Sequence, residues 1–339
     1  MQIAYNPMNN EAAPRTSVME KHELEVPELA LEDVFYPWGF PLSVRTNSFE
    51  VLRHCEEMWG RFSLRYDAKP IRGEVWVLEN DGTECPPAPT YRLIGGMWVT
   101  VADADNYCVL NMERSESHIV ITQGALRHPL YAQHFLLGMM ACCVTTHHAT
   151  PVHAACVALD GKGVLLCGDS GAGKSTLAFA CARAGWTYVT DDATLLVHEC
   201  ESERKSQHVT GDCHRIRFRP SAAKLFPELQ GMEVTPRAAG KPSVELPTAV
   251  MTDIHCAETA HVDFIVFLNR NWGGPPKIAP YSKDIARSSM RKVLFAPGQI
   301  RLAQHEVIER LLEAPVLEMR YTEMDAAVRC LHALVREGK

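Results

Sequence analysis

Residues 168–175 read Gly-Asp-Ser-Gly-Ala-Gly-Lys-Ser and fit the pattern G-x-x-x-x-G-K-[ST] at each fixed position. An apolar run at 164–167 precedes the motif, and a helical pattern at 174–184 follows it and ends at Gly185. A buried strand before the loop and a helix after it are the neighbours that a phosphate-binding loop requires. The sequence therefore predicts a nucleotide-binding loop in an α/β core, with these cofactor-binding residues: Gly168, Asp169, Ser170, Gly171, Ala172, Gly173, Lys174, Ser175 and Thr176.

The residue types of this loop explain why it would bind phosphate. Glycines let the backbone curl so that successive N–H groups point toward phosphate oxygens. The start of the helix adds the positive end of its dipole. We expect Lys174 to reach the β- and γ-phosphates of ATP and the Ser175 hydroxyl to help hold Mg²⁺. A chance glycine-rich turn is the alternative, and the flanking strand and helix argue against it.

Two adjacent acids, Asp191 and Asp192, end the short strand expected at 188–190. Ligands of open α/β sheets sit at the carboxyl ends of strands, so the pair should face the phosphates. Phosphoryl transfer needs one acid that helps place Mg²⁺ and one carboxylate that takes a hydroxyl proton, and two aspartates can divide these tasks. An acidic turn is the alternative. His153, on the strand expected at 153–159, is a further catalytic candidate that would pair with the base or with a transferring phosphoryl group; a structural histidine is the alternative.

Three arginines alternate with apolar residues between positions 215 and 219. On a strand, Arg215, Arg217 and Arg219 would share one face, where they can clamp phosphate or an acidic acceptor peptide through bidentate contacts. Lys241, in a Gly-Lys-Pro loop, is a similar candidate for the acceptor or the γ-phosphate. A solvated strand face explains the arginine pattern equally well.

The pattern of expected strands and helices changes along the chain. Before residue 128, β-like runs separated by turn residues surround one helix at 48–59; the clearest runs are 75–78, 91–94, 97–101 and 118–121. A largely apolar helix is expected at 129–146, and strands and helices alternate from 150 onward, ending in a helix capped by Thr322. We expect three parts: a loose N-terminal arm (1–32), a small α+β domain (33–127) and a nucleotide-binding α/β domain (128–339).

Composition narrows the class of protein. The chain has 339 residues, 46% of them hydrophobic, which is enough for a substantial core. The formal net charge is -7 with both signs mixed, which argues against a protein that coats nucleic acid or an anionic membrane. The cysteines lack C-x-x-C spacing and several lie in apolar runs, as expected in a reducing compartment. With no apolar N-terminal signal and no run long enough to cross a bilayer, a cytoplasmic location is expected.

Three segments, taken together, resemble one known family. They are His153-Ala154-Ala155, the run from 163 to 175, and Gly185-Trp186-Thr187-Tyr188-Val189-Thr190-Asp191-Asp192. This combination is similar to the catalytic half of HPr kinase/phosphorylase, which has a histidine ahead of a hairpin, a G-D-S-G-x-G-K-S loop and, after a glycine, A-D-D. The resemblance covers residues 153–192, with a threonine at position 190 in place of the alanine.

The resemblance implies an ATP-dependent serine kinase with a P-loop core of the HPr kinase type in residues 128–339. It implies that Lys174 and Ser175 hold phosphate and Mg²⁺ and that Asp192 accepts the proton. Asp191 would then support the metal or the base, and His153 would assist.

The chain also departs from the family. The stretch 214–219 lacks the acidic metal ligand that HPr kinases carry before an I-R-G stretch, so neither a second metal ligand nor the reverse reaction is implied. The N-terminal region differs from that of the bifunctional enzymes. The chain is more similar to HPr-kinase-like proteins of peptide-modification systems, some of which phosphorylate a serine on a ribosomally made precursor peptide. HPr kinases assemble as hexamers, which leaves a homo-oligomer open.

The leading hypothesis is a kinase that uses ATP and Mg²⁺ to phosphorylate a hydroxyl, most readily a serine of a peptide or small protein recognised by residues 33–127. One alternative is a kinase for a small hydroxylated metabolite, which would need a closed pocket rather than a groove. The other is a nucleotide-dependent binding or regulatory module without transfer activity. The Asp191-Asp192 pair argues against the module, and the missing acidic ligand argues for it.

Overall fold

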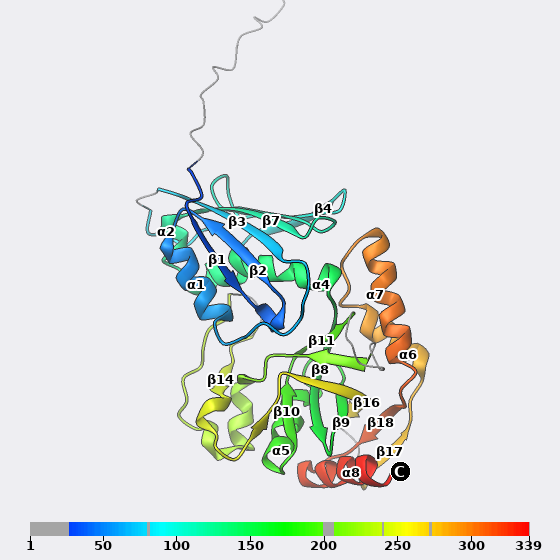
Figure 1. The fold of residues 1–339 in the computed structure, drawn as a ribbon. Helices are drawn as coiled ribbons and strands as arrows, with labels where there is room; N and C mark the ends of the chain where they lie inside the picture. Colours follow the sequence, from blue (N-terminus) through cyan, green and yellow to red (C-terminus); the bar gives the residue numbers. More distant parts are fainter. Residues whose placement is uncertain (1–26, 80–81, 199–206, 239–240, 271–272, 339) are drawn as a thin grey trace, which may run out of the picture.

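The computed structural model describes residues 27–79, 82–198, 207–238, 241–270 and 273–338. They form a mixed α/β fold with a seven-stranded, a nine-stranded and a two-stranded sheet. In Figure 1 the two larger sheets lie at opposite ends of the molecule, with α4 (Val144–His147) between them. Of the predicted N-terminal arm, residues 1–26 lie outside the described residues, and the first strand begins at Leu31.

The seven-stranded sheet has the order β1-β2-β3-β7-β6-β5-β4. The β2–β3 and β3–β7 pairs are parallel and the other neighbours are antiparallel. Its strands are β1 (Leu31–Phe35), β2 (Leu42–Thr46), β3 (Ile71–Leu78), β4 (Thr90–Ile94), β5 (Met97–Val101), β6 (Tyr107–Asn111) and β7 (Glu116–Thr122). The four β-like runs of the sequence are confirmed as parts of β3, β4, β5 and β7, whereas β1, β2 and β6 were not anticipated.

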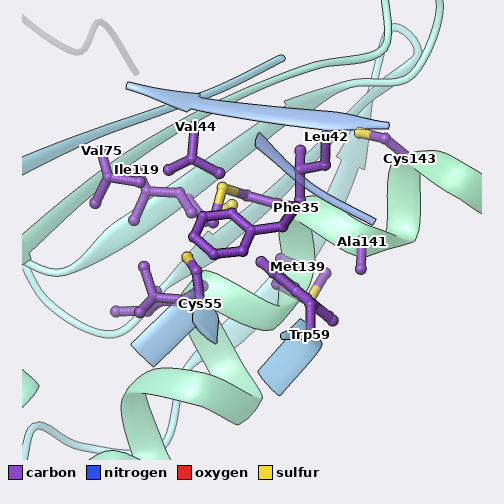
Figure 2. Close-up of a cluster of buried hydrophobic side chains, with 14 of the residues drawn as sticks. Phe35, Leu42, Val44, Cys55, Trp59, Val75, Ile119, Met139, Ala141 and Cys143 are labelled. Carbon is purple, nitrogen blue, oxygen red and sulfur yellow. The ribbon is translucent and has the colours of Figure 1, made fainter. Parts of the chain in front are cut away.

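One face of this sheet is buried by helices. Residues of β3 alternate between buried and more exposed, as expected for a strand with one covered face. Helix α1 (Phe49–Trp59) packs on that face, and its N-cap Ser48 accepts a hydrogen bond from the Glu50 amide, which confirms the helix expected there. Figure 2 shows the core, in which Phe35 of β1 lies near Trp59 of α1 and Val44 of β2 belongs to the same cluster.

The helix expected at 129–146 is irregular. After a separate short helix, α2 (Gln123–Leu126), this range is divided into α3 (Pro129–Tyr131), a π-helical turn (Ala132–Leu136), a 3₁₀ stretch (Leu137–Cys143) and α4. The helix type changes between Leu136 and Leu137, and at the neighbouring Gly138 a Cβ would lie 2.2 Å from the Gln133 carbonyl oxygen. Its buried side chains, such as Leu136 and Met140, belong to the core of the first sheet. This packing extends the first core past the boundary expected at residue 127.

The nine-stranded sheet is organised by two long strands, β8 (Ala149–Leu159) and β16 (Thr259–Asn269). The other strands are β9 (Lys162–Cys167), β10 (Thr187–Thr190), β11 (Ala193–Val197), β12 (His208–Thr210), β15 (His255–Cys256), β17 (Lys277–Pro280) and β18 (Val316–Arg320). Strand β8 pairs with β9, β10 and β11, while β16 pairs with β9, β12 and β18. Because β11 pairs with both β12 and β8, the five strands β8, β9, β16, β12 and β11 form a closed ring of pairings.

Helices cover both sides of these strands. Helices α5 (Lys174–Arg183) and α8 (Met324–Glu337) lie side by side and share a core with the two-stranded sheet of β13 (Arg215–Phe218) and β14 (Val244–Pro247). Helices α6 (Lys283–Arg291) and α7 (Gly298–Leu311) cover a second core. The cap expected from Thr322 was wrong: Glu323 holds the N-cap position of α8 and makes no side-chain capping hydrogen bond.

Polar contacts join the part of the molecule built on the seven-stranded sheet, which we call the first half, to the part built on the nine-stranded sheet, the second half. Arg61, just after α1, donates to Asp212 at 2.9 Å, and Arg65 donates to Glu258 at 2.8 Å. On the other side, Gln304 of α7 donates to the Thr145 carbonyl of α4. Among the described residues, no helix has both the length and the apolar content that a bilayer crossing requires.

Candidate active site

The glycine loop, residues 168–173, connects β9 to α5 as the motif predicts. Gly168, Gly171 and Gly173 have φ angles of 146°, 94° and 98°, which residues with a Cβ rarely adopt. A Cβ on Gly168 would also lie 2.9 Å from that of Ala172, so the loop leaves no room for one. The expected strand, loop and helix are thus confirmed as local structure, and the loop has the shape of a cradle whose backbone can approach phosphate closely.

Lys174 is the first residue of α5, and its amine turns back toward the loop. Its Nζ donates to the Gly168 carbonyl at 2.8 Å and lies 3.0 Å from His153 Nε2. The side chain is buried, and burial lowers the pKa of Lys174. A desolvated ammonium held by an imidazole nitrogen and a carbonyl oxygen is placed to bind an anion that enters the loop.

His153 and Asp192 form a pair beside this amine. Ala154 of β8 lies opposite Cys167, the last residue of β9, so His153 is adjacent to the loop. His153 Nδ1 lies 3.0 Å from Asp192 Oδ1. Because the lysine donates to Nε2, the proton of the neutral imidazole belongs on Nδ1 and is donated to Asp192. This hydrogen bond is the main reason that the pKa of Asp192 lies below its ordinary value.

Asp191 has a different environment. It is 6% exposed, and its two carboxylate oxygens accept from the Tyr188 hydroxyl at 3.2 Å and the Arg217 amide at 3.0 Å. Burial raises the pKa of Asp191 to about 6. The carboxylate therefore ties the end of β10 to β13, while its main-chain carbonyl accepts from Ser175 Oγ at 3.4 Å. Both carboxylate oxygens of Asp191 thus have protein partners. The metal-binding role expected for Asp191 stays a prediction.

The side chains of Asp191 and Asp192 point in different directions because the pair lies between two strands, β10 and β11. Strands β10 and β11 lie along the same edge of β8, with Thr190 opposite Cys156 and Ala193 opposite His153. Asp191 and Asp192 form the interruption between them. The first side chain turns to the core and the second to His153, as alternation along an extended chain requires.

The three arginines between positions 215 and 219 have different protein partners. Arg215 forms ion pairs with Asp212 at 3.0 Å and Glu245 at 3.6 Å, and Arg217 lies 3.4 Å from the same glutamate. Arg219 follows the end of β13 and donates to Ser170 Oγ of the glycine loop at 2.8 Å. The shared face expected on a strand thus holds for Arg215 and Arg217, and Arg219 joins the loop.

Two cavities flank the glycine loop. The larger one, about 1120 Å³, lies between the loop, the end of β16 and helix α6, and includes Tyr281 and Ile285. The smaller one, about 870 Å³, contains the opposite side of the loop. It brings together these predicted residues: His153, Ser170, Gly171, Gly173, Lys174, Ser175, Thr176, Asp191, Asp192, Arg217, Arg219 and Lys241. Arg215 does not line it.

The cavities also contain residues that sequence reasoning missed. Arg270 lines both cavities, and Arg237 lines the smaller one together with Leu130 and His134 of the first half. No motif marks these positions; they are brought in by β16, by the loop before β14 and by the irregular helical segment. Among the described residues, no group of three or more His, Cys, Asp or Glu side chains is arranged to hold a metal ion. Mg²⁺ typically needs only one or two carboxylates when phosphate and water complete its shell.

Comparison with known proteins gives two similarities. Residues 107–210, from β6 to β12, match the family "SynChlorMet cassette protein ScmC"; this range includes the glycine loop, His153 and both aspartates. The solved HPr(Ser) kinase/phosphatase from Coxiella burnetii is similar over 56% of this chain and 93% of its own, with 14% sequence identity and a TM-score of 0.30. A TM-score this low does not establish a shared fold. No curated protein matches the chain.

Proposed function

We propose that this chain is an ATP-dependent kinase with a P-loop core, which transfers the γ-phosphoryl group to a hydroxyl, most readily a serine of a peptide or small protein. The observation that carries the proposal is the row of contacts from Lys174 through His153 to Asp192, each 3.0 Å long, beside the glycine loop. Lys174 and Asp192 line the same cavity, and a cation that binds phosphate together with a carboxylate that takes a proton is the minimum that a phosphoryl-transfer site needs.

The two cavities suggest where the substrates bind. Lys174, Ser175 and Asp192 all line the smaller cavity, so the γ-phosphate and the acceptor hydroxyl would meet there. The nucleoside would then extend into the larger cavity, where Tyr281 stacks on Phe267 with ring centroids 4.6 Å apart. The glycine loop lies between the cavities and would hold the phosphates in its cradle.

The residues present fit Mg²⁺-ATP, and each has a defined task. Glycine-loop amides, Lys174 and Arg219 would hold phosphate oxygens. Mg²⁺, when bound, would neutralise charge on the β- and γ-phosphates, and Ser175 with an aspartate would hold it. Asp192 takes the proton from the acceptor hydroxyl, and the hydrogen bond from His153 keeps this carboxylate ionised and aimed into the cavity.

The test is transfer of label from γ-labelled ATP with Mg²⁺ to serine-containing peptides. We expect label on peptide with the native chain and a loss of about 10³-fold with Lys174→Ala, because the variant lacks the cation that binds the phosphates. Lys69→Ala, at an exposed position that lines neither cavity, is the matched control and should transfer normally.

The same experiment separates the alternatives. Label that appears on small hydroxylated compounds and never on peptides would identify a metabolite kinase. Nucleotide that binds through Lys174 but transfers to no acceptor, over a broad peptide and metabolite panel, would contradict the kinase proposal and leave a nucleotide-dependent binding module.

A further inference from the structure

The smaller cavity is lined by more cationic side chains than the phosphates of the nucleotide would contact. Among the described residues, these seven cationic side chains line it: Lys174, Arg217, Arg219, Lys224, Arg237, Lys241 and Arg270. The only carboxylates among its described lining residues are Asp191 and Asp192. Lys174 and Arg219 contact the glycine loop directly, and Arg270 also lines the larger cavity, so these three serve the phosphates. The remainder faces the part of the cavity that the acceptor would enter.

Arg217, Arg237 and Lys241 form what we call the basic wall. Arg217 comes from β13, and the other two come from the segment before β14. The first half of the molecule contributes Leu130 and His134 to the same lining. The basic wall thus belongs to a cavity lined by both halves, and we assign it to the acceptor.

The arginines of the basic wall are held in place before any ligand binds. Glu245 lies 2.6 Å from Arg237 and 3.4 Å from Arg217, and it also pairs with Arg215. Arg237 Nε donates to Ser243 Oγ at 2.9 Å. Fixed guanidinium groups lose little conformational entropy when they bind an anion, which favours bidentate recognition of a carboxylate.

Glu245 is shared by both guanidinium groups of the basic wall, whereas Arg215 has a second acidic partner in Asp212. Burial, together with the nearby Arg215 and Arg237, lowers the pKa of Arg217, as expected where like charges are crowded. Burial, Arg237 and Arg217 likewise lower the pKa of His134, so this ring is neutral and adds no charge at neutral pH. The excess positive charge is thus intrinsic to the basic wall and is available to an incoming anion.

We propose that the acceptor is an acidic peptide, in which an Asp or Glu side chain next to the phosphorylated serine binds to Arg217 and Arg237, with Lys241 at the edge of the site. This inference rests on the proposed kinase function and specifies its substrate class. A carboxylate matches the planar guanidinium fork, and it would leave the serine hydroxyl free to face Asp192.

The experiment compares peptides of nearly the same shape that differ by two negative charges. Each peptide is acetylated and amidated, so that its termini are neutral, and contains one serine flanked by Asp and Glu or by Asn and Gln. We expect kcat/KM to be about ten- to hundredfold higher for the acidic peptide, the range for a charge-assisted hydrogen bond. Arg237→Gln and Arg217→Gln should bring this ratio close to one. Arg237→Glu should favour a lysine-flanked peptide.

Controls keep the result interpretable if a variant folds poorly. Arg336→Gln removes an exposed arginine that pairs with Asp160 and lines neither cavity, and it should keep the native ratio. Nucleotide affinity, measured for every variant, reports whether the glycine loop is intact.

Three outcomes would overturn the inference, and they differ in what they leave standing. Equal kcat/KM for acidic and neutral peptides would refute acidic recognition while the kinase proposal survives. Phosphorylation of small hydroxy acids but of no peptide would refute the peptide class. Transfer to no acceptor at all would remove the proposed function together with this inference.

Discussion

The two walls of the smaller cavity are built in different ways. The glycine loop is one contiguous stretch between β9 and α5, and its shape comes from backbone angles that glycine permits. The basic wall is assembled from side chains of β13 and the segment before β14, and Glu245 and Ser243 hold its arginines in place. A wall made of backbone can bind any phosphate, whereas a wall made of side chains can select one acceptor. The comparison predicts that changes in the first affect catalysis and changes in the second affect selectivity.

The largest expected effect comes from Asp192→Asn, on the catalytic side. The variant keeps the size of the side chain but cannot take the hydroxyl proton, so kcat should fall by about 10²- to 10⁴-fold. Nucleotide affinity, measured by calorimetry, should stay close to the native value because no phosphate contact is removed. A variant that transfers phosphate normally would show that Asp192 is not the base.

A smaller effect on the same side is expected from His153→Ala. Hydrogen bonding from His153 is the main cause of the lowered pKa of Asp192, so the pKa of this carboxyl should rise when the imidazole is removed. The acid limb of the kcat/KM profile should therefore move to higher pH, with a rate loss of about tenfold at neutral pH. His118→Ala, at an exposed position in β7 of the first sheet, is the matched control. An unshifted acid limb would contradict the pairing.

On the other wall, Glu245→Gln should act on stability and selectivity rather than on chemistry. The substitution leaves Arg215, Arg217 and Arg237 without their shared negative partner, and we expect unfolding to become easier by about 1–2 kcal/mol. Glu228→Gln, in an exposed pair with Arg183, should cost less than about 1 kcal/mol. Denaturant unfolding measures both. If the two variants are equally stable, Glu245 does not hold the basic wall together.

The last prediction concerns the pH dependence of stability from Asp191, which is bonded to the Arg217 amide of the basic wall. Its pKa in the folded chain is about 6, above the ordinary value of 3.8, so the folded state binds the proton more tightly than the unfolded chain does. The contribution to stability is then complete below pH 3.8 and is lost as pH rises through 6. Asp191→Asn should flatten the stability profile between pH 4 and 7. An unchanged profile would show that Asp191 titrates normally.

Local structure around the motif could be predicted because it depends on neighbouring residues. The strand before Gly168, the helix from Lys174 and the left-handed Gly185 follow from apolar runs and glycine conformations, and the structure has all three. The helix at 129–146 could not be predicted in detail. Its π-helical and 3₁₀ turns depend on packing against the first sheet, which propensity does not encode.

The site shows the same limit. Adjacency in sequence predicted that Asp191 and Asp192 lie together, but not which one is buried, because that depends on how β10 and β11 flank β8. Arg237 and Arg270 carried no sequence signal, since single arginines in loops are common and only the fold brings them to the cavity.

The sequence by itself determined the shape of the glycine loop, because a run of glycines followed by lysine and serine sets backbone geometry within a few residues. It also determined that His153 and the aspartate pair lie near that loop, since short strands connect them. Only the tertiary structure decided that Asp192 rather than Asp191 pairs with His153 and that Arg219 turns to the loop. It alone assembled the basic wall around Glu245. Those features depend on contacts between segments far apart in the chain, whose free energies no local pattern contains.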